Sequence, residues 1–256
     1  MHSKYNLATV KPDIDVLFRA ASGGDDILFD WVAVEIPSGT CVLKSVQGTI
    51  MGVDGAAGNN TDIQLFFAKS INGVAPATFG TVHAATSATI SAAFRRNIIG
   101  HLHLDGSSTF MTDMVGYNVV GGMSSQSADN VSDGGYGETV CLQGEPHVTR
   151  KGFQTIYVAA MCHGSGQSYS TEVDLNMAGN QAASTTAVQI TTSGTDPRTV
   201  FQPGDIVIGH TGTVEMEVVS VDSATTMTVK NVTAQIDHQE ELILKNPIDL
   251  RLGLEY

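Results

Sequence analysis

The sequence predicts an all-β protein, a jelly-roll-type β-sandwich with a small β-barrel domain inserted before its last strand. Three observations lead to this prediction. Apolar and polar residues alternate with a period of two over many short segments, which is typical of half-buried strands. Turns rich in Gly, Pro and Asn separate these segments, and 27 of the 256 residues are glycine. No segment shows a long helical period or an alternation of strands with helices, which disfavours an α/β architecture.

Eight segments are expected to form the sandwich. Most carry apolar side chains on one face, and the segment that holds the single tryptophan, Trp31, is a nearly continuous apolar run. Their ranges are 13–20, 27–36, 41–51, 62–68, 98–104, 153–162, 171–177 and 248–256. The third and fourth of these flank a loop rich in Gly and Asn, so we expect them to pair as a hairpin.

The last strand determines the predicted domain organisation. Its large apolar residues alternate strictly with Asp249, Arg251, Gly253 and Glu255. So large an apolar face cannot be left in water, and the small barrel is too short to need a further strand. The strand is therefore expected to return to the sandwich. The predicted domains are an N-terminal arm at 1–12, a sandwich at 13–177 plus 247–256, and a barrel insertion at 178–246.

Two segments of the sandwich domain are candidates for partner contacts. The polar arm at 1–12 is either disordered or reaches a neighbouring subunit. The long Gly-rich segment 105–151 is expected to be the main partner-contacting surface, because long loops carry function more often than strands do. Short strands are expected within it at 114–120 and 139–142.

The barrel is predicted to have five short strands, most of them within 199–245. The turn 201–205, Phe-Gln-Pro-Gly-Asp, leads into an apolar strand at 206–208. In the strand 215–221 outward glutamates give way to inward valines, and this change of phase indicates a bulge. The barrel surface is acidic, with Asp205, Glu215, Glu217, Asp222, Asp237, Glu240 and Glu241 against Lys230 and Lys245.

Composition excludes several classes of function. The net charge of −13 disfavours binding to nucleic acid or to anionic lipid, so neither a nucleic-acid nor a membrane partner is expected. The three cysteines show no CxxC spacing, which favours a reduced, intracellular folding environment. No apolar run approaches the length of a membrane span, and the N-terminus lacks the apolar core of a signal peptide.

The barrel carries a resemblance to a known group of proteins. The phrase FQPGDIVIG, a glutamate-bearing strand that ends in VVSVD, and then TTMTVK are similar to small SH3-like barrel modules of tailed-bacteriophage virion proteins. Segments such as GTIMGVDGAAGNNTDIQLFFAKS also look like phage structural sandwiches. The resemblance implies a structural virion protein of the capsid decoration or cement type, assembled in the host cytoplasm.

Each candidate for catalysis or metal binding also has a structural explanation. His101 and His103 share a strand face and are a possible zinc pair, although two solvent-facing histidines are favoured because no further ligand is evident. Cys141, Cys162 and His163 suggest a nucleophile, but no third group orients them, and buried thiols on core strands are commoner. Two groups of loop oxygens suit calcium but lack the EF-hand spacing, and are interpreted as turn residues: Asp129, Asp133 and Glu138; Asp54, Asn59, Asn60 and Asp62.

The sequence thus predicts a non-enzymatic structural protein with no cofactor and no metal. The expected partners are the major capsid protein or other virion proteins, together with further copies of the chain in a homo-oligomer. A trimer is preferred because the resemblance implies threefold positions on a shell. A glycan- or receptor-binding module of a phage tail or fibre is the alternative. A third hypothesis is a metal hydrolase built on the histidine pair. The candidate contact residues are Lys4, Tyr5, Arg95, Arg96, Tyr117 and Tyr136.

Overall fold

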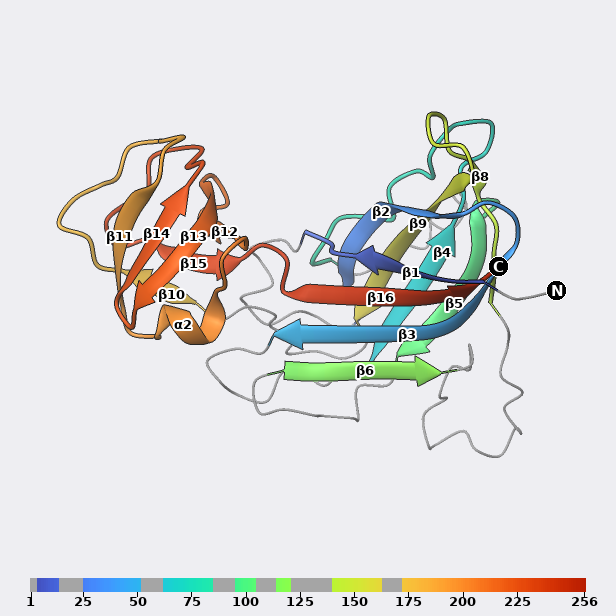
Figure 1. Cartoon of the computed structure of the whole chain (residues 1–256), viewed down its shortest axis with the longest axis horizontal. Helices are drawn as coiled ribbons and strands as arrows, with labels where there is room; N and C mark the ends of the chain where they lie inside the picture. The colour runs from blue at the N-terminus through green and yellow to red at the C-terminus, as the bar shows by residue number, and fades with distance from the viewer. Residues whose placement is uncertain are drawn as a thin grey trace.

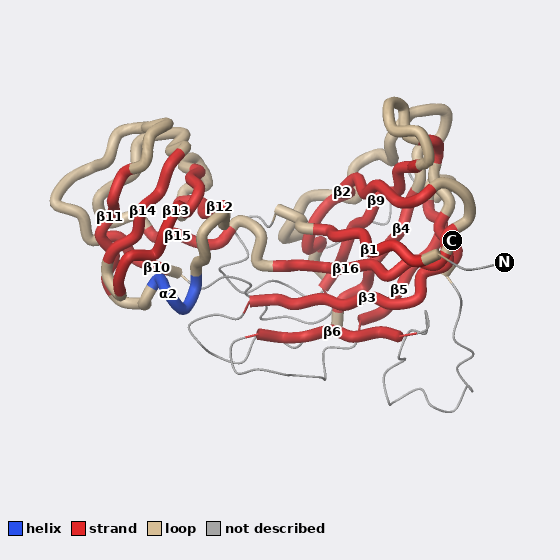
Figure 2. Tube along the Cα trace, viewed as in Figure 1, coloured by secondary structure: helices blue, strands red, loops and turns tan. Residues whose placement is uncertain are grey.

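The computed structural model describes residues 4–13, 25–51, 62–84, 95–104, 114–120, 140–162 and 172–256. In this part the chain is all-β, as predicted. Two antiparallel sheets curve around one core as a half-barrel, and a closed six-stranded barrel follows near the C-terminus (Figure 1). The short helix α2 (Pro197–Val200) is the one helix of the described ranges (Figure 2). None of the described helices is long and apolar enough to cross a membrane.

The first sheet has the order β1-β16-β3-β6, formed by β1 (Tyr5–Val10), β16 (Ile248–Glu255), β3 (Cys41–Met51) and β6 (Met114–Val120). The two-residue strand β7 (Cys141–Leu142) pairs with the start of β3. The last strand, β16, therefore lies between β1 and β3. This position confirms the expectation that the final strand, which follows the barrel in sequence, pairs with strands from the first part of the chain.

The second sheet has the order β2-β9-β4-β5, formed by β2 (Ile27–Pro37), β9 (Phe153–Cys162), β4 (Ile63–Ala68) and β5 (Ile98–Leu104). The short strand β8 (Glu145–Pro146) pairs with the start of β9. The inward side chains of both sheets form a single buried cluster, to which Leu43 and Leu252 contribute from the first sheet and Phe67 and Val158 from the second. We call the two sheets and this core the two-sheet unit.

Three expectations about these strands are wrong or untested. The segments at 41–51 and 62–68 do not form a hairpin, since β3 lies in the first sheet and β4 in the second. The N-terminal segment is not a free arm, because residues 5–10 pair along their whole length with β16. Most of the strand expected at 13–20 lies outside the described residues. The pairing partner of a strand is set by contacts between sheets, which the alternation within one strand does not report.

The barrel has six strands where the sequence indicated five. Around the ring these are β10 (Val173–Leu175), β11 (Val188–Ser193), β14 (Thr226–Lys230), β13 (Glu215–Ser223), β12 (Ile206–Gly209) and β15 (Glu241–Leu244). The segment 171–177, which the sequence assigned to the sandwich, supplies β10 and closes the ring between β11 and β15. Val173 and Leu175 are buried in the barrel core, so the barrel begins earlier than position 178.

Local features of the barrel agree with the sequence interpretation. The pairing of β13 with β14 shifts register after Val218 and again after Val221, which confirms the predicted bulge. In the turn 201–205 the carboxylate of Asp205 accepts a hydrogen bond from the backbone N–H of Gln202 at 2.7 Å, and Gly204 has a φ of 94°. A side chain is strained at such a φ, so glycine suits this position.

The connection from the barrel to β16 consists of residues 245–247. Residue Lys245 leaves β15, and its ammonium group lies 2.9 Å from Glu215 of the barrel and 3.3 Å from Asp13. The side chain of Asn246 donates to the carbonyl oxygen of Pro12 at 2.9 Å. Since β12 and β15 are antiparallel, the ends of these strands at Gly209 and Glu241 lie away from this connection.

Candidate functional site

Four of the six predicted contact residues lie at the end of the two-sheet unit that is remote from the barrel. Lys4 is hydrogen-bonded through its backbone to Tyr256, with N–O distances of 3.1 and 3.0 Å, where β1 begins and β16 ends. Tyr5 points outward with 71% of its surface exposed. Arg95 and Arg96 are exposed in the turn before β5. For Tyr117 the structure describes only the backbone, in β6, and Tyr136 lies outside the described residues.

The turn at 70–74, which follows β4, is held by a carboxylate from a distant part of the chain. Glu145 accepts hydrogen bonds from the Ser70 hydroxyl at 2.8 Å and from the backbone N–H groups of Asn72 and Gly73 at 2.6 and 2.7 Å. The Gly73 N–H, the Ser70 hydroxyl and the Asn72 N–H keep the pKa of Glu145 below its ordinary value. This carboxylate ties the turn to β8.

Replacing Glu145 by Gln is expected to destabilise the two-sheet unit and to flatten its acid response. The pKa of this carboxyl is lower in the folded state, so its ionised form stabilises the fold above the unfolded pKa of about 4.3. This contribution is lost as pH falls through the folded pKa. Urea unfolding followed by Trp31 fluorescence between about pH 3 and pH 7 measures the slope. The control Glu217→Gln changes a carboxyl in the barrel, where residues 172–246 contain no Trp or Tyr. An unchanged acid slope in the Glu145 variant would contradict this role.

A second turn, residues 147–152, directly follows β8, the strand to which Glu145 ties the first turn. The ring nitrogen Nδ1 of His147 accepts from the backbone N–H of Arg150 at 3.0 Å, and its Nε2 lies 3.1 Å from Glu35. The guanidinium of Arg150 also pairs with Glu35 and lies 3.9 Å from the ring centre of Phe153. Val148 projects from this turn with 97% of its surface exposed. The turn therefore presents an apolar side chain on a well-bonded backbone.

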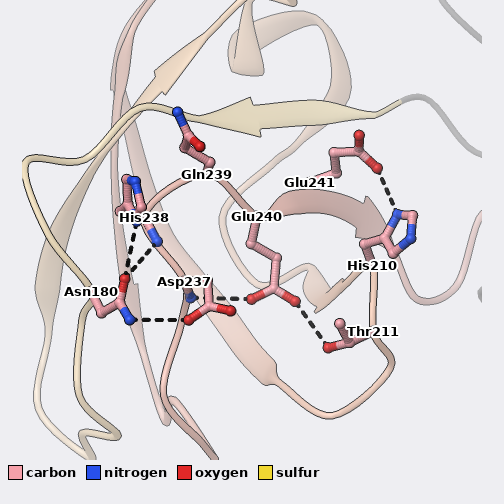
Figure 3. Close-up of a pocket in the computed structure, with 8 residues that line it drawn as sticks. All are labelled: Asn180, His210, Thr211, Asp237, His238, Gln239, Glu240 and Glu241. Carbon is pink, nitrogen blue, oxygen red and sulfur yellow. Dashed lines mark hydrogen bonds and ion pairs between the residues drawn. The ribbon is translucent and has the colours of Figure 1, made fainter.

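The barrel carries an open hollow of about 560 Å³ at the ends of β12 and β15 that lie away from Lys245 (Figure 3). Its lining combines three carboxylates, two imidazoles, two amides and a hydroxyl. These residues are Asn180, His210, Thr211, Asp237, His238, Gln239, Glu240 and Glu241.

Hydrogen bonds order most of this lining. His210 Nδ1 lies 2.6 Å from Glu241, and Asn180 bonds both Asp237 and His238, at 3.1 and 3.2 Å. This hollow was not predicted from the sequence. The run Asp237 to Glu241 was seen only as part of an acidic surface, although its density of polar side chains is the signal that marks the hollow.

Glu240 is the buried member of the hollow, with 8% of its surface exposed. It accepts from the Thr211 hydroxyl at 3.1 Å and from the backbone N–H of Asp237 at 3.3 Å. A Cβ atom on Gly209 would overlap this carboxylate. Gly209 therefore makes room for Glu240 on the floor of the hollow.

The substitution Gly209→Ala is expected to displace Glu240 and to destabilise the barrel by about 1–3 kcal/mol. The double variant Gly209→Ala, Glu240→Ala should lose less stability than the sum of the two single variants, because the overlap is then absent. Calorimetry measures these losses. Gly179→Ala is the control, since a Cβ there meets nothing within 4 Å. Strictly additive losses would show that the two positions are not coupled.

The other sequence candidates are placed as follows. His101 is exposed and His103 half-buried on one face of β5, while Leu102 and Leu104 face the core, as predicted. Gln64 lies 3.1 Å from His101, and Asp62 lies 3.0 Å from His103. In the described ranges no group of three or more His, Cys, Asp or Glu side chains is placed to hold a metal ion.

The cysteine candidates are not brought together. Cys162 is buried and its thiol lies 3.3 Å from the carbonyl oxygen of Asp26, whereas Cys141 is exposed on β7. The partner proposed for them, His163, lies outside the described residues. So do most of the candidate calcium ligands, namely Asp54, Asn59, Asn60, Asp129, Asp133 and Glu138.

Comparison with known proteins identifies no family for the chain. No protein-family profile matches the chain, and no curated protein matches it.

Proposed function

We propose that the chain is a structural component of a phage particle, a capsid decoration or cement protein that stabilises the shell through protein–protein contacts. In this role it acts without catalysis and without a cofactor. It occurs in the virion after assembly in the host cytoplasm. Its partners are the major capsid protein or other virion proteins and further copies of itself, with a trimer preferred.

The observation that carries the proposal is the outward face of β1. Tyr5 and Leu7 expose 71% and 60% of their surfaces there, although β1 is paired in register with β16. Next to Leu7 on this face stands Gly253, which has no side chain to cover it. Large apolar side chains on an ordered, paired strand form a preorganised contact surface. Such contacts are individually weak, and the symmetry of a shell multiplies them.

The fold gives further support to this role. We propose that the two-sheet unit is a jelly-roll-type sandwich and a domain of its own, with the barrel as an inserted domain. The strands β1, β2, β3 and β4 fall alternately in the first and second sheets, as jelly-roll connections require. The resemblance of the barrel sequence to phage virion modules supports the same structural role.

The test is co-sedimentation of the purified protein with undecorated phage shells. We expect saturable binding at a fixed ratio to the capsid subunit. The double substitution Tyr5→Ser and Leu7→Ser should weaken binding, whereas Thr9→Ser, on the same face of β1, should not. The absence of wild-type co-sedimentation at saturating protein, or full binding by the double variant, would contradict the proposal.

The glycan- or receptor-binding role in a phage tail or fibre is the second candidate, and the hollow in the barrel favours it. Carboxylates, amides and imidazoles that converge in one concavity are groups that hydrogen-bond sugar hydroxyls. A glycan array decides this case. Binding that Asp237→Asn abolishes would support the second candidate, and the absence of any bound glycan would remove it.

A further inference from the structure

Positive charge gathers at one end of an acidic chain. Of the 13 Lys and Arg residues, five lie on three neighbouring turns at the end of the second sheet remote from the barrel. We call this surface the basic end, and it comprises Lys69, Arg95, Arg96, Arg150 and Lys151. Of the acids described on these turns and beside them, Glu35 pairs with Arg150 and offsets its charge, while Glu145 accepts the hydrogen bonds of the 70–74 turn.

Hydrogen bonds hold the three turns together. The backbone N–H of Lys69 donates to the carbonyl oxygen of Asn97 at 2.8 Å, and the Asn97 side chain donates back to the Lys69 carbonyl at 2.8 Å. This exchange places the Arg95–Arg96 turn beside β4. Glu145 then links the turn at 70–74 to β8 and hence to the 147–152 turn. The cations therefore belong to one surface.

Apolar side chains stand among these cations. Val148 and Val74 expose 97% and 68% of their surfaces, and each projects from a turn closed by backbone hydrogen bonds. Ile71 and Val74 exchange such bonds at 3.0 and 3.1 Å. Because the turns are already ordered, docking these side chains costs little conformational entropy. Apolar groups inside a charged rim are the usual anatomy of a protein interface.

The barrel has the opposite charge. Residues 172–246 contain ten Asp and Glu against three Lys and Arg. The hollow concentrates this charge, since Asp237, Glu240 and Glu241 line it and none of its eight lining residues is Lys or Arg. The strand β9 starts at the basic end and runs toward the barrel (Figure 1). The hollow lies at the ends of β12 and β15 that are away from the connection through Lys245.

We propose that the basic end of one copy docks against the acidic hollow of a second copy, head to tail. This inference rests on the homo-oligomer part of the proposed function and names the surfaces involved. The basic end carries cations around the exposed side chains of Val148 and Val74, and the hollow is concave and lined by carboxylates, so their charges are complementary. A nucleic acid or other polyanion fits less well, because the net charge of −13 repels it and exposed valines add nothing to phosphate binding.

A head-to-tail contact has consequences for assembly. It uses two different surfaces, so it closes into a ring or extends into a chain. Its charged rim makes it sensitive to salt, since surface charges are screened over about 10 Å at about 0.1 M salt. The mass of the assembly should therefore rise with protein concentration and fall on addition of salt.

Two variants test the two surfaces separately. The basic-end variant carries Arg95→Glu, Arg96→Glu and Lys151→Glu, three exposed side chains outside the bonded clusters described above. The hollow variant carries Asp237→Lys and Gln239→Lys, both exposed, and leaves the buried Glu240 in place. Both variants keep the Asp and Glu residues of 121–139. Circular dichroism and calorimetry establish that each variant is folded.

Sedimentation equilibrium of wild type, each variant and their mixture measures the association. The wild-type protein should form oligomers, and each variant should associate about tenfold or more weakly. An equal mixture of the two variants should form dimers and stop there, because only one intact basic end can meet one intact hollow. Val148→Asp should weaken the wild-type association, while Thr149→Ser should not.

Several results would overturn the inference. These are a wild-type protein that stays monomeric at low salt, variants that oligomerise like wild type, and a mixture that fails to form dimers. Shell co-sedimentation of the two variants separates this inference from the proposed function. Monomeric variants that still bind shells through β1 would leave the proposed function standing whatever the result for self-association.

Discussion

Removal of residues 248–256 is expected to unfold the two-sheet unit and to leave the barrel folded. The strand β16 lies between β1 and β3, so its loss leaves two strands without their common partner. Its side chains Ile248, Leu250, Leu252 and Leu254 are fully buried. Burying four such groups contributes about 6–12 kcal/mol, which is comparable to the whole stability of a domain, about 5–15 kcal/mol.

Trp31 fluorescence measures this loss in the two-sheet unit alone, because residues 172–246 contain no Trp or Tyr, and circular dichroism reports the remaining barrel. A graded version uses point substitutions on the two faces of the strand. Leu252→Ala should cost about 2–5 kcal/mol, while Arg251→Ala, on the exposed face, should change stability by less than about 0.5 kcal/mol. A native Trp31 signal after the truncation would show that β16 is dispensable.

Replacement of Gln154 by Leu is expected to destabilise the two-sheet unit by about 2–5 kcal/mol, since each buried backbone group left unpaired costs about 1–3 kcal/mol. The buried Gln154 side chain donates to the carbonyl oxygens of Pro37 and Gly39 at 2.7 and 2.5 Å, and accepts from the Gly144 N–H at 3.0 Å. Leu has nearly the same volume and pairs with none of them. Urea unfolding followed by Trp31 emission measures the change.

Gln143→Leu provides the matched control, because this neighbouring glutamine is exposed. It should leave the midpoint nearly unchanged. The Gln154 bonds fix the start of β9 and the residues before β8, so the variant should also loosen the 147–152 turn, measurable as faster amide exchange at Val148 and Thr149. Equal midpoints for the two variants would mean that the buried hydrogen bonds of Gln154 contribute nothing net.

Much of the fold can be predicted from alternation within single strands. The segment that became β16 shows a clean period of two, and so do residues 101–104 of β5. Each buries its apolar face as that period requires. The bulge in β13 was also visible as a change of phase. These features are local, and a period of two reports directly which face of a strand is buried.

The pairing of strands could not be predicted in the same way. The strands β3 and β4 adjoin in sequence and were expected to form a hairpin, yet they belong to different sheets. The short strand β10 was assigned to the wrong unit, because three alternating residues suit either core. In β1 the outward positions hold Tyr5 and Leu7. Apolar residues on both faces hide the period of two.

The candidate sites were predictable to a similar degree. Arg95 and Arg96 were predicted as contact residues, and the bonds between Asn97 and Lys69 place their turn beside Lys69. The bonds of Glu145 to a turn more than seventy residues earlier, and the approach of Glu240 to Gly209, depend on tertiary contacts. No local pattern in the sequence encodes such contacts.

The central position of β16 also sets an order of events during synthesis. The first sheet cannot be completed until residue 255 has left the ribosome, because β16, which lies between β1 and β3, is made after both of them. The barrel strands, from 173 to 244, are all available earlier. Domains generally fold as units while the chain emerges. The barrel is thus expected to be folded before the two-sheet unit, whose core stays open until β16 has been made.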